Sequence, residues 1–269
     1  MELTDILRCP KTGNKLRFDD SDSLVHVEHS DLTYPIIDGI VDFCPQVRDT
    51  VSRTYDAIAS RYDTYMTSSN LFMKVVNTIV WGLGDDPDYE DTVLSYLPSQ
   101  FDGILLDVPV GTGVFTCSLY AGFPNATIIA VDYSMGMLQK ARHRFQQHGV
   151  NNVCLLRADV ANLPVRDAAI HIVLSMNGLH AFPDKQRAIA EMRRVLRKQG
   201  TLIACCYVRG ARRLSDWFVK HFGVRLRFFS SPVLHVDDIA SQLEGFTMSR
   251  QSNVKSFVYF EAINKRKEN

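Results

Sequence analysis

The sequence predicts an α/β protein with a mostly parallel sheet, preceded by a small β-rich module. From Phe101 onwards, apolar segments of strand length alternate with amphipathic segments of helical periodicity, an order typical of a parallel sheet covered on both faces. The last two apolar runs, residues 246–254 and 256–264, follow each other almost directly. They predict a C-terminal antiparallel hairpin, because a parallel return requires a crossover of about a dozen residues.

Three regions are expected along the chain. Residues 1–46 hold short apolar pieces broken by proline, glycine and aspartate, a pattern that predicts the β-rich module. Residues 47–100 show helical periodicity and predict a helical arm or lid, with a plain structural connector as the alternative. Residues 101–269 form the expected α/β core.

Five parallel strands and four helices are expected in the core. The strands span residues 103–108, 127–132, 153–158, 169–176 and 200–207. The helices lie near residues 113–122, 135–149, 185–197 and 235–243. Ligands of open α/β sheets bind where the carboxyl ends of the strands meet, so candidate functional residues are those that follow the strands.

Composition restricts the function classes. The 269 residues are 46% hydrophobic and 22% charged, which is typical of a globular protein and excludes disordered or collagen-like chains. Thirty Lys and Arg balance thirty Asp and Glu, so no overall field favours nucleic acid, although a local basic patch is compatible. Six scattered cysteines without a C-x-x-C pair, no signal-peptide pattern and no apolar run of about 20 residues predict a reduced, cytoplasmic protein without a membrane span.

A glycine turn follows the first core strand. Asp107 ends this strand, and Gly111 and Gly113 follow it; without Cβ atoms they allow a tight turn and the close approach of a ligand. Such a turn also occurs in α/β chains that bind nothing there, so neighbouring residues must support the interpretation.

Acidic residues end the next two strands. Asp132 follows Gly113 by nineteen residues, where a carboxylate accepts hydrogen bonds from both hydroxyls of a ribose. The alternative is a capping turn, because Ser134 is placed to cap the helix that begins at Met135. Asp159 ends the third strand, where it could meet the edge of an adenine ring.

These motifs, taken in order, resemble those of class I S-adenosylmethionine-dependent methyltransferases, and most closely the ubiquinone/menaquinone-biosynthesis type. The resemblance covers residues 50–269. It implies a Rossmann-like seven-stranded sheet whose antiparallel strand lies next to the fifth, with S-adenosylmethionine as cofactor and S-adenosylhomocysteine as product. It also implies a small-molecule acceptor that is apolar or aromatic. The segments that carry it are Leu106–Gly113, Ala130–Ala141, Arg157–Pro164, Ile172–Pro183 and Ala188–Leu202.

The resemblance assigns roles to individual residues. It implies that the methionine part of the cofactor is surrounded by Asp107, Gly111, Thr112 and Gly113. It implies that the ribose is held by Asp132 and Tyr133, and the adenine by Met137, Asp159 and Val160. Asn177 and His180 are expected in the methyl-transfer crevice, and Tyr55 and Tyr62 in an arm that closes over the cofactor, with helix packing as the alternative for both tyrosines.

His180 is the candidate general base. An unperturbed imidazole titrates near pH ~6.5, and this one is expected at the carboxyl edge of the sheet. The alternative is that His180 only shapes the wall of the crevice. Methyl transfer draws much of its rate from orientation, so a base is not required in every such enzyme.

Two residues depart from the family pattern. Pro109 stands where the D-x-G-x-G-x-G motif has its first glycine, so the loop there has φ near −65° and one N–H donor fewer. His171 replaces an acidic residue at the start of the fourth strand and is interpreted as a tolerated strand-edge residue.

The N-terminal module resembles a zinc-ribbon-like unit that activates, or is fused to, methyltransferases. The matching pieces are Leu7–Thr12 and Tyr34–Ile40. Thr12 occupies the position of a second zinc-binding cysteine, so the module is expected to be metal-free. An alternative four-ligand site would combine residues of irregular spacing, namely Cys9, His26, His29 and Cys44.

Residues 209–232 interleave aromatic and basic side chains. Three interpretations fit: a cap over an apolar substrate, an RNA-binding surface, or an amphipathic helix with Leu214, Trp217, Phe218 and His221 at helical spacing. The RNA interpretation leads to an RNA methyltransferase as an alternative function, which zero net charge disfavours. A catalytically inactive binding or scaffold protein is the other alternative. A nicotinamide-dependent enzyme is disfavoured because Thr116 replaces the third glycine of G-x-G-x-x-G.

Overall fold

The computed structural model describes residues 2–19, 23–26, 31–45, 55, 77–82 and 89–265. The expected arm is therefore described only at Tyr55, in the short π-helix η2 (Asn77–Trp81) and in α3 (Tyr89–Leu94). Tyr62, the second tyrosine expected in the arm, lies outside the described residues.

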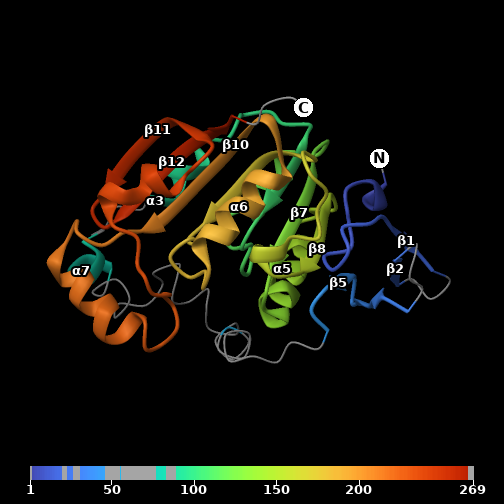
Figure 1. The fold of residues 1–269 in the computed structure, drawn as a ribbon, viewed down its shortest axis with the longest axis horizontal. Helices are drawn as coiled ribbons and strands as arrows, with labels where there is room; N and C mark the ends of the chain where they lie inside the picture. Colours follow the sequence, from blue (N-terminus) through green and yellow to red (C-terminus); the bar gives the residue numbers. More distant parts are fainter. Residues whose placement is uncertain are drawn as a thin grey trace.

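The core is a mostly parallel sheet, as predicted (Figure 1). Its strands run in the order β11-β12-β10-β9-β6-β7-β8-β5-β4, with β12 antiparallel to both of its neighbours. Strand β12 lies beside β10, the fifth core strand, as the family resemblance implies. The seven core strands are β6 (Ile104–Asp107), β7 (Thr127–Asp132), β8 (Val153–Arg157), β9 (Ile170–Met176), β10 (Leu196–Tyr207), β11 (Phe246–Val254) and β12 (Phe257–Asn264).

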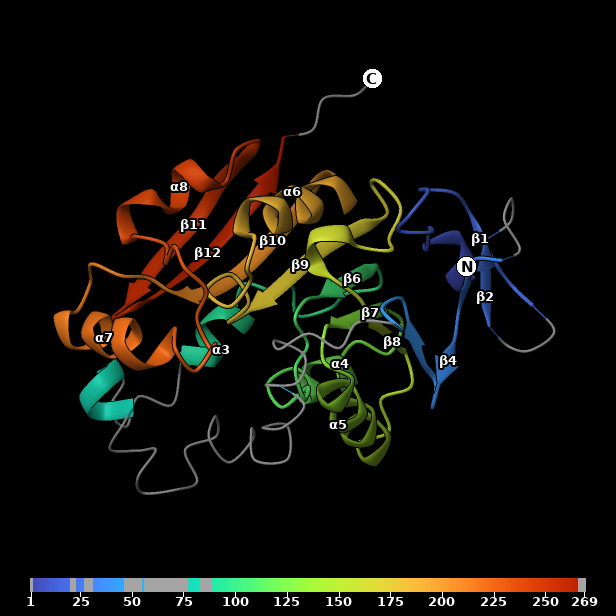
Figure 2. The same cartoon turned by 60° about the horizontal axis from the view of Figure 1, so that its bottom comes forward.

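Helices cover both faces of the sheet (Figure 2). Along β6, Leu106 packs with the cluster under α6, whereas its neighbour Leu105 packs with the cluster under α5. This alternation follows from the two-residue period of a strand, and it explains why the parallel strands are apolar throughout. The helices are α4 (Cys117–Ala121), α5 (Met135–Gln147), α6 (Lys185–Val195), α7 (Arg213–Phe218) and α8 (Ile239–Gln242), with the short elements η3 (Val160–Asn162), η4 (Val219–Gly223) and η5 (Val236–Asp238).

The N-terminal module extends the sheet beyond its seven core strands. After η1 (Leu3–Asp5), it forms a separate three-stranded sheet from β1 (Leu16–Phe18), β2 (Leu24–His26) and β3 (Thr33–Tyr34). Its last strands, β4 (Ile36–Ile37) and β5 (Ile40–Asp42), form a hairpin, and β5 pairs in parallel with β8. The module is thus continuous with the core sheet, a pairing that the short apolar run did not predict.

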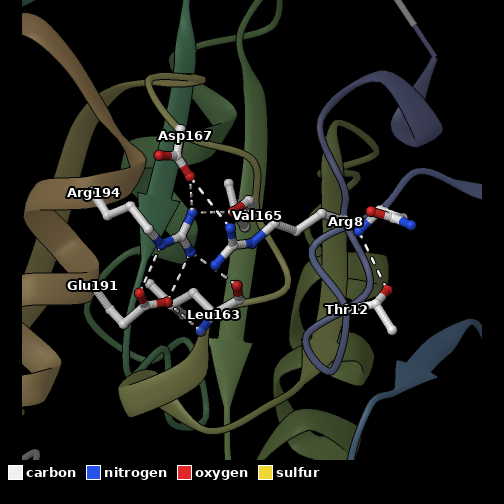
Figure 3. Close-up of polar contacts among 8 residues, drawn as sticks. Arg8, Thr12, Leu163, Val165, Asp167, Glu191 and Arg194 are labelled. Carbon is white, nitrogen blue, oxygen red and sulfur yellow. Dashed lines mark hydrogen bonds and ion pairs between the residues drawn. The ribbon is translucent and has the colours of Figure 1, made fainter.

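A polar network fastens the start of the module to the core (Figure 3). Asp167 accepts hydrogen bonds from Arg8 Nη1 at 3.3 Å and from Arg194 Nη1 at 2.8 Å. Arg194, on α6, also pairs with Glu191, whose Oε2 accepts from the Leu163 N–H at 2.8 Å. One arginine of α6 therefore holds the loop against which the first residues of the chain pack.

A buried ion pair joins the end of the module to β8. Arg157 Nη1 donates to Asp42 Oδ2 at 3.1 Å, and the two side chains are 9% and 4% exposed. The same nitrogen donates to the Cys44 carbonyl at 3.1 Å, and Nε donates to the Tyr133 carbonyl at 3.2 Å. Arg157 thus connects the module with the loop that follows β7.

The cysteines of the module take part in packing. Cys9 is buried and its Sγ lies 3.1 Å from Tyr34 Oη, while burial raises the pKa of the Cys44 thiol to about 11. Of the alternative metal ligands, the His26 side chain and His29 lie outside the described part of the chain. Within the described residues, no three His, Cys, Asp or Glu side chains gather as metal ligands, and no helix is long and apolar enough to cross a bilayer.

We predict that Asp42→Ala destabilises the whole chain. The change leaves the Arg157 guanidinium buried without its carboxylate, which costs about 3–5 kcal/mol and lowers the unfolding midpoint by about 10 °C. Thermal unfolding measures this effect. Lys15→Ala is the matched control, because its ion pair with Asp5 is exposed and its loss changes stability by about 0.5 kcal/mol or less. An Asp42→Ala midpoint equal to that of the control would show that the module is not coupled to the core.

Candidate functional site

A cavity of about 270 Å³ lies at the carboxyl edge of the sheet. The loops after four strands line it: residues 107–112 and 114–116 after β6, 132–134 and 137 after β7, 158–160 after β8, and 176, 177 and 181–183 after β9. Tyr55 of the expected arm completes the lining. The cavity therefore lies where a parallel α/β sheet is expected to bind its ligand.

Asp107 is the most deeply buried charged group of the cavity, with 1% of its surface exposed. Its Oδ2 accepts hydrogen bonds from Tyr120 Oη at 2.6 Å and Thr116 Oγ1 at 3.3 Å, whereas Oδ1 is buried without a partner among the described residues. Burial raises the pKa of this carboxyl to about 7, although the two hydroxyl donors oppose the shift. An unsatisfied buried oxygen that lines a cavity indicates a ligand that supplies a donor or a positive charge.

The glycine turn after β6 presents backbone to the cavity. Gly111 has φ +57°, and apart from its chain neighbours no atom of the described residues lies within 4 Å of the position that a Cβ would occupy, so there is open space beside it. Gly113 has φ +68°, but a Cβ there would lie 2.9 Å from the ring of Phe145 on α5, and the residue does not line the cavity. Gly113 thus allows the chain to turn against α5, and its contact with a ligand stays a prediction.

Asp132 takes part in the turn before α5 and also lines the cavity. Its Oδ2 accepts from the Gly111 N–H and its Oδ1 from the Ser134 N–H, each at 2.9 Å. Ser134 Oγ in turn accepts from the Met137 N–H at 3.1 Å and caps α5. The carboxylate thus fixes the glycine turn and the helix start, and Asp132 lines the cavity.

An apolar slot with one carboxylate forms the end of the cavity near β8. Asp159 Oδ1 accepts from the Ala161 N–H at 2.8 Å, which orients the side chain at the start of η3. The buried side chains of Val160 and Met137 flank it. This arrangement suits a flat heterocycle that has an apolar face and an amino group at its edge.

The proline that departs from the family motif is accommodated by a glycine in the neighbouring loop. A Cβ on Gly178 would lie 2.5 Å from Pro109 Cδ and 2.6 Å from the ring of Phe182. Only a residue without a side chain fits between these rings. Pro109 and Phe182 both line the cavity. The absence of a side chain at Gly178 therefore allows both rings to pack against this loop in the cavity wall.

The structure does not place His180 as a general base. Its side chain is buried below the cavity wall, where Nδ1 accepts from the Tyr207 N–H at 3.0 Å and the ring stacks on Phe229 at 4.7 Å. Burial, with the nearby charge of Lys185, lowers the pKa of the imidazole to about 3. The loop after β9 turns Ala181 and Phe182, rather than His180, toward the cavity. This placement favours the alternative that His180 only shapes the wall, and a base at this position stays a prediction.

Tyr55 and residues 209–232 meet beside the cavity. The Tyr55 ring contacts Phe228 edge to face at 6.3 Å, and burial raises the pKa of its hydroxyl. No residue of 209–232 lines the cavity itself within the described chain. The expected amphipathic helix forms as α7 and η4, but Leu214 and Trp217 are exposed, and the buried face consists of Ser215, Val219 and Gly223.

The structure brings most of the predicted site residues together. Those that line the cavity are Tyr55, Asp107, Gly111, Thr112, Asp132, Tyr133, Met137, Asp159, Val160 and Asn177. Sequence reasoning missed Thr116 and Tyr120, the two donors to Asp107. Their spacing of four residues just after the glycine turn could have indicated one helical face directed at the end of β6.

Comparisons with known proteins agree with this geometry. Residues 105–200 match the family model described as "Methyltransferase domain". A malonyl-[acyl-carrier protein] O-methyltransferase of Xylella fastidiosa is 34% identical over 114 residues, which are 42% of this chain and 38% of that protein. A demethylmenaquinone methyltransferase of Corynebacterium kroppenstedtii is 30% identical over 155 residues, which are 58% of each. The chain thus spans less than two thirds of either relative.

A solved structure shows the same fold. A SAM-dependent methyltransferase from Thermotoga maritima superposes with a TM-score of 0.58 at 18% sequence identity, covering 80% of this chain and 100% of that one. The family match over residues 105–200 and this superposition show that the chain contains a region similar to methyltransferase domains and shares the fold of a SAM-dependent methyltransferase.

We predict that His180 stays neutral across the physiological pH range. With a pKa lowered to about 3, its ring resonance in NMR spectra should not shift between about pH 5 and 8. A His180→Gln variant identifies the resonance by its loss. A titration midpoint between about pH 6 and 7 at this ring would contradict the buried placement.

Proposed function

We propose that the chain transfers a methyl group from S-adenosylmethionine to a small apolar or aromatic acceptor. One observation carries the proposal: Asp107 lines the cavity, and its Oδ1 atom is buried without a hydrogen-bond partner among the described residues. The amino group of the cofactor's methionine part is a cation with N–H donors, so it matches what this oxygen lacks.

The charge of the cavity supports this cofactor. Three carboxylates, Asp107, Asp132 and Asp159, line it, and no lysine or arginine occurs among the described lining residues. Such a lining attracts a molecule that carries a sulfonium and an ammonium group, and it repels the phosphates of a nicotinamide dinucleotide or of RNA. Pro109 further removes one backbone N–H from the turn that would have to bind a phosphate.

The lining divides into parts that match the parts of the cofactor. Asp107 and the open backbone at Gly111 and Thr112 would hold the methionine part. Asp132, with Tyr133 beside it, would accept the ribose hydroxyls. Met137 and Val160 would pack on the adenine, and Asp159 would accept its amino group. When bound, S-adenosylmethionine supplies an electrophilic methyl group.

The wall next to Asn177 supports an apolar acceptor. Val114, Phe115 and Phe182 give the cavity apolar lining, and Phe182 lies against Gly178, the residue after Asn177. The demethylmenaquinone methyltransferase among the relatives is named for an apolar aromatic acceptor. Because no histidine lines the described cavity, the acceptor is expected to react without a histidine base, and the protein contributes mainly its orientation.

Cofactor binding to matched variants tests the proposal. Isothermal titration should show binding of S-adenosylmethionine and S-adenosylhomocysteine but not of NAD. Asp107→Asn should weaken binding about 10- to 100-fold, because it removes a charge-assisted hydrogen bond. Asp102→Asn is the control, since Asp102 is exposed just before the amino end of the same strand. Equal affinity of both variants, or no binding of either adenosyl ligand, would refute the proposal.

We predict that cofactor affinity depends on pH through Asp107. Its pKa is raised to about 7, so lowering the pH from about 8 to 6 protonates the carboxyl and removes its attraction for the ammonium group. The dissociation constant of S-adenosylmethionine should therefore rise about tenfold over this range, and Asp107→Asn should abolish the dependence. The free energy of unfolding of the free chain changes with pH in the opposite sense. Because the pKa of Asp107 is higher in the folded than in the unfolded chain, protonation stabilises the fold, and this stabilisation is lost as the pH rises through about 7. A pH profile unchanged in Asp107→Asn would contradict this assignment.

A further inference from the structure

Large apolar side chains are exposed on one end of the molecule. Together they define a surface, here named the cap surface, around α7 and η4. Each of these side chains is between 40% and 54% exposed. In Figures 1 and 2, α7 lies at the end of the molecule opposite the N-terminal module. The members of the cap surface are Ile79, Leu214, Trp217, Phe222 and Leu226.

The cap surface is presented by a helix whose apolar face points outward. Small or short side chains, Ser215 and Gly223 among them, face the core instead. Hydrogen bonds attach this helix to β10 and to η2. Asp216 accepts from Tyr207 Oη at 2.6 Å, Ser215 Oγ donates to the Val80 carbonyl at 2.6 Å, and Arg212 Nη2 donates to the Ile79 carbonyl at 2.7 Å. A firmly held, exposed apolar face of this size indicates an interaction site.

Basic residues surround the apolar side chains. Residues 209–232 contain six Lys or Arg and a single acidic residue, Asp216, whose carboxylate is bonded to Tyr207 and to the Gly210 N–H. The chain as a whole carries no net charge. Within the described structure, no carboxylate lies within ion-pair distance of Arg213, Lys220, Arg225 or Arg227, and all four are exposed.

We propose that the cap surface docks on the surface of an anionic lipid bilayer. Leucine, tryptophan and phenylalanine side chains would enter the boundary between headgroups and acyl chains, while the lysine and arginine side chains reach the anionic headgroups. The rings of the patch favour lipid over RNA. Trp217 stacks on His221 at 5.1 Å and Phe218 on Phe222 at 5.5 Å, so one face of each of these rings is already occupied and is not available for stacking on a base.

Docking would place the cavity near the membrane. Phe228, at the end of the same segment, contacts Tyr55 of the cavity, and Phe229 stacks on His180 beneath its wall. An apolar acceptor dissolved in the bilayer would then reach the cavity with little exposure to water. This delivery rests on the proposed function, whereas the docking itself does not.

Vesicle sedimentation of the full chain tests the docking. The chain should bind phosphatidylcholine vesicles that contain phosphatidylglycerol as about one third of the lipid, bind pure phosphatidylcholine weakly, and lose affinity as salt is added. Trp217→Ser/Phe222→Ser should lower the affinity about tenfold or more. Phe18→Ser/Ile37→Ser is the control, because it removes exposed apolar side chains from the module.

Charge reversal tests the basic side chains separately. Arg213→Glu/Lys220→Glu should weaken binding about 20-fold or more, whereas Lys11→Glu/Lys140→Glu, with the same change in net charge, should have little effect. Circular dichroism and S-adenosylmethionine titration of every variant should match the unmodified chain. Intact cofactor binding without vesicle binding would overturn the docking alone, and vesicle binding without cofactor binding would overturn only the proposed function.

Three other results would overturn the docking. The first is an equal loss of vesicle binding in the control variants. The second is tighter binding of single-stranded RNA than of vesicles, abolished by Trp217→Ser/Phe222→Ser. The third is a concentration-dependent dimer, seen by sedimentation velocity, that the same variant converts to a monomer, because the cap surface would then be covered by a second copy of the chain.

Discussion

Parallel strands joined by crossover helices end at the same edge of a sheet, and this constraint brings Asp107, Asp132 and Asp159 together around one cavity. Burying the carboxylates of Asp107 and Asp132 close to the exposed Asp159 is unfavourable unless they receive donors. The fold supplies them locally, from two hydroxyls for Asp107 and from backbone N–H groups for the other two. Among the described residues Asp107 still lacks a donor on Oδ1, and the cationic group of the proposed cofactor would supply it.

Contacts made by the N-terminal module also help to position the cavity wall. Strand β5 extends the sheet next to β8, and the buried pair of Asp42 with Arg157 closes this junction. Arg157 also holds the carbonyl of Tyr133, a residue of the cavity lining. The position of the cavity wall near β7 therefore depends on contacts made by the module, although the two are far apart in the sequence.

Local sequence patterns predicted much of this structure. The features that depend on contacts between distant parts of the chain were not predicted. The parallel strands, the terminal hairpin and the Ser134 cap follow from periodicity and spacing, which act over a few residues. The direction of the His180 side chain and the contact of Gly113 with α5 depend on how a loop packs against distant elements. The helical spacing of Leu214 and Trp217 identified one face of a helix, but spacing alone does not say whether that face meets the core or solvent. The pairing of β5 involves three residues, too few for a clear signal.

A crystal structure of the chain with S-adenosylhomocysteine tests the central claim most directly. The account predicts that the ligand's ammonium group lies within hydrogen-bond distance of Asp107 Oδ1, its ribose hydroxyls at Asp132, and its adenine between Met137 and Val160 with the amino group at Asp159. Ligand bound elsewhere, or in the reverse orientation with the adenine at Asp107, would contradict it.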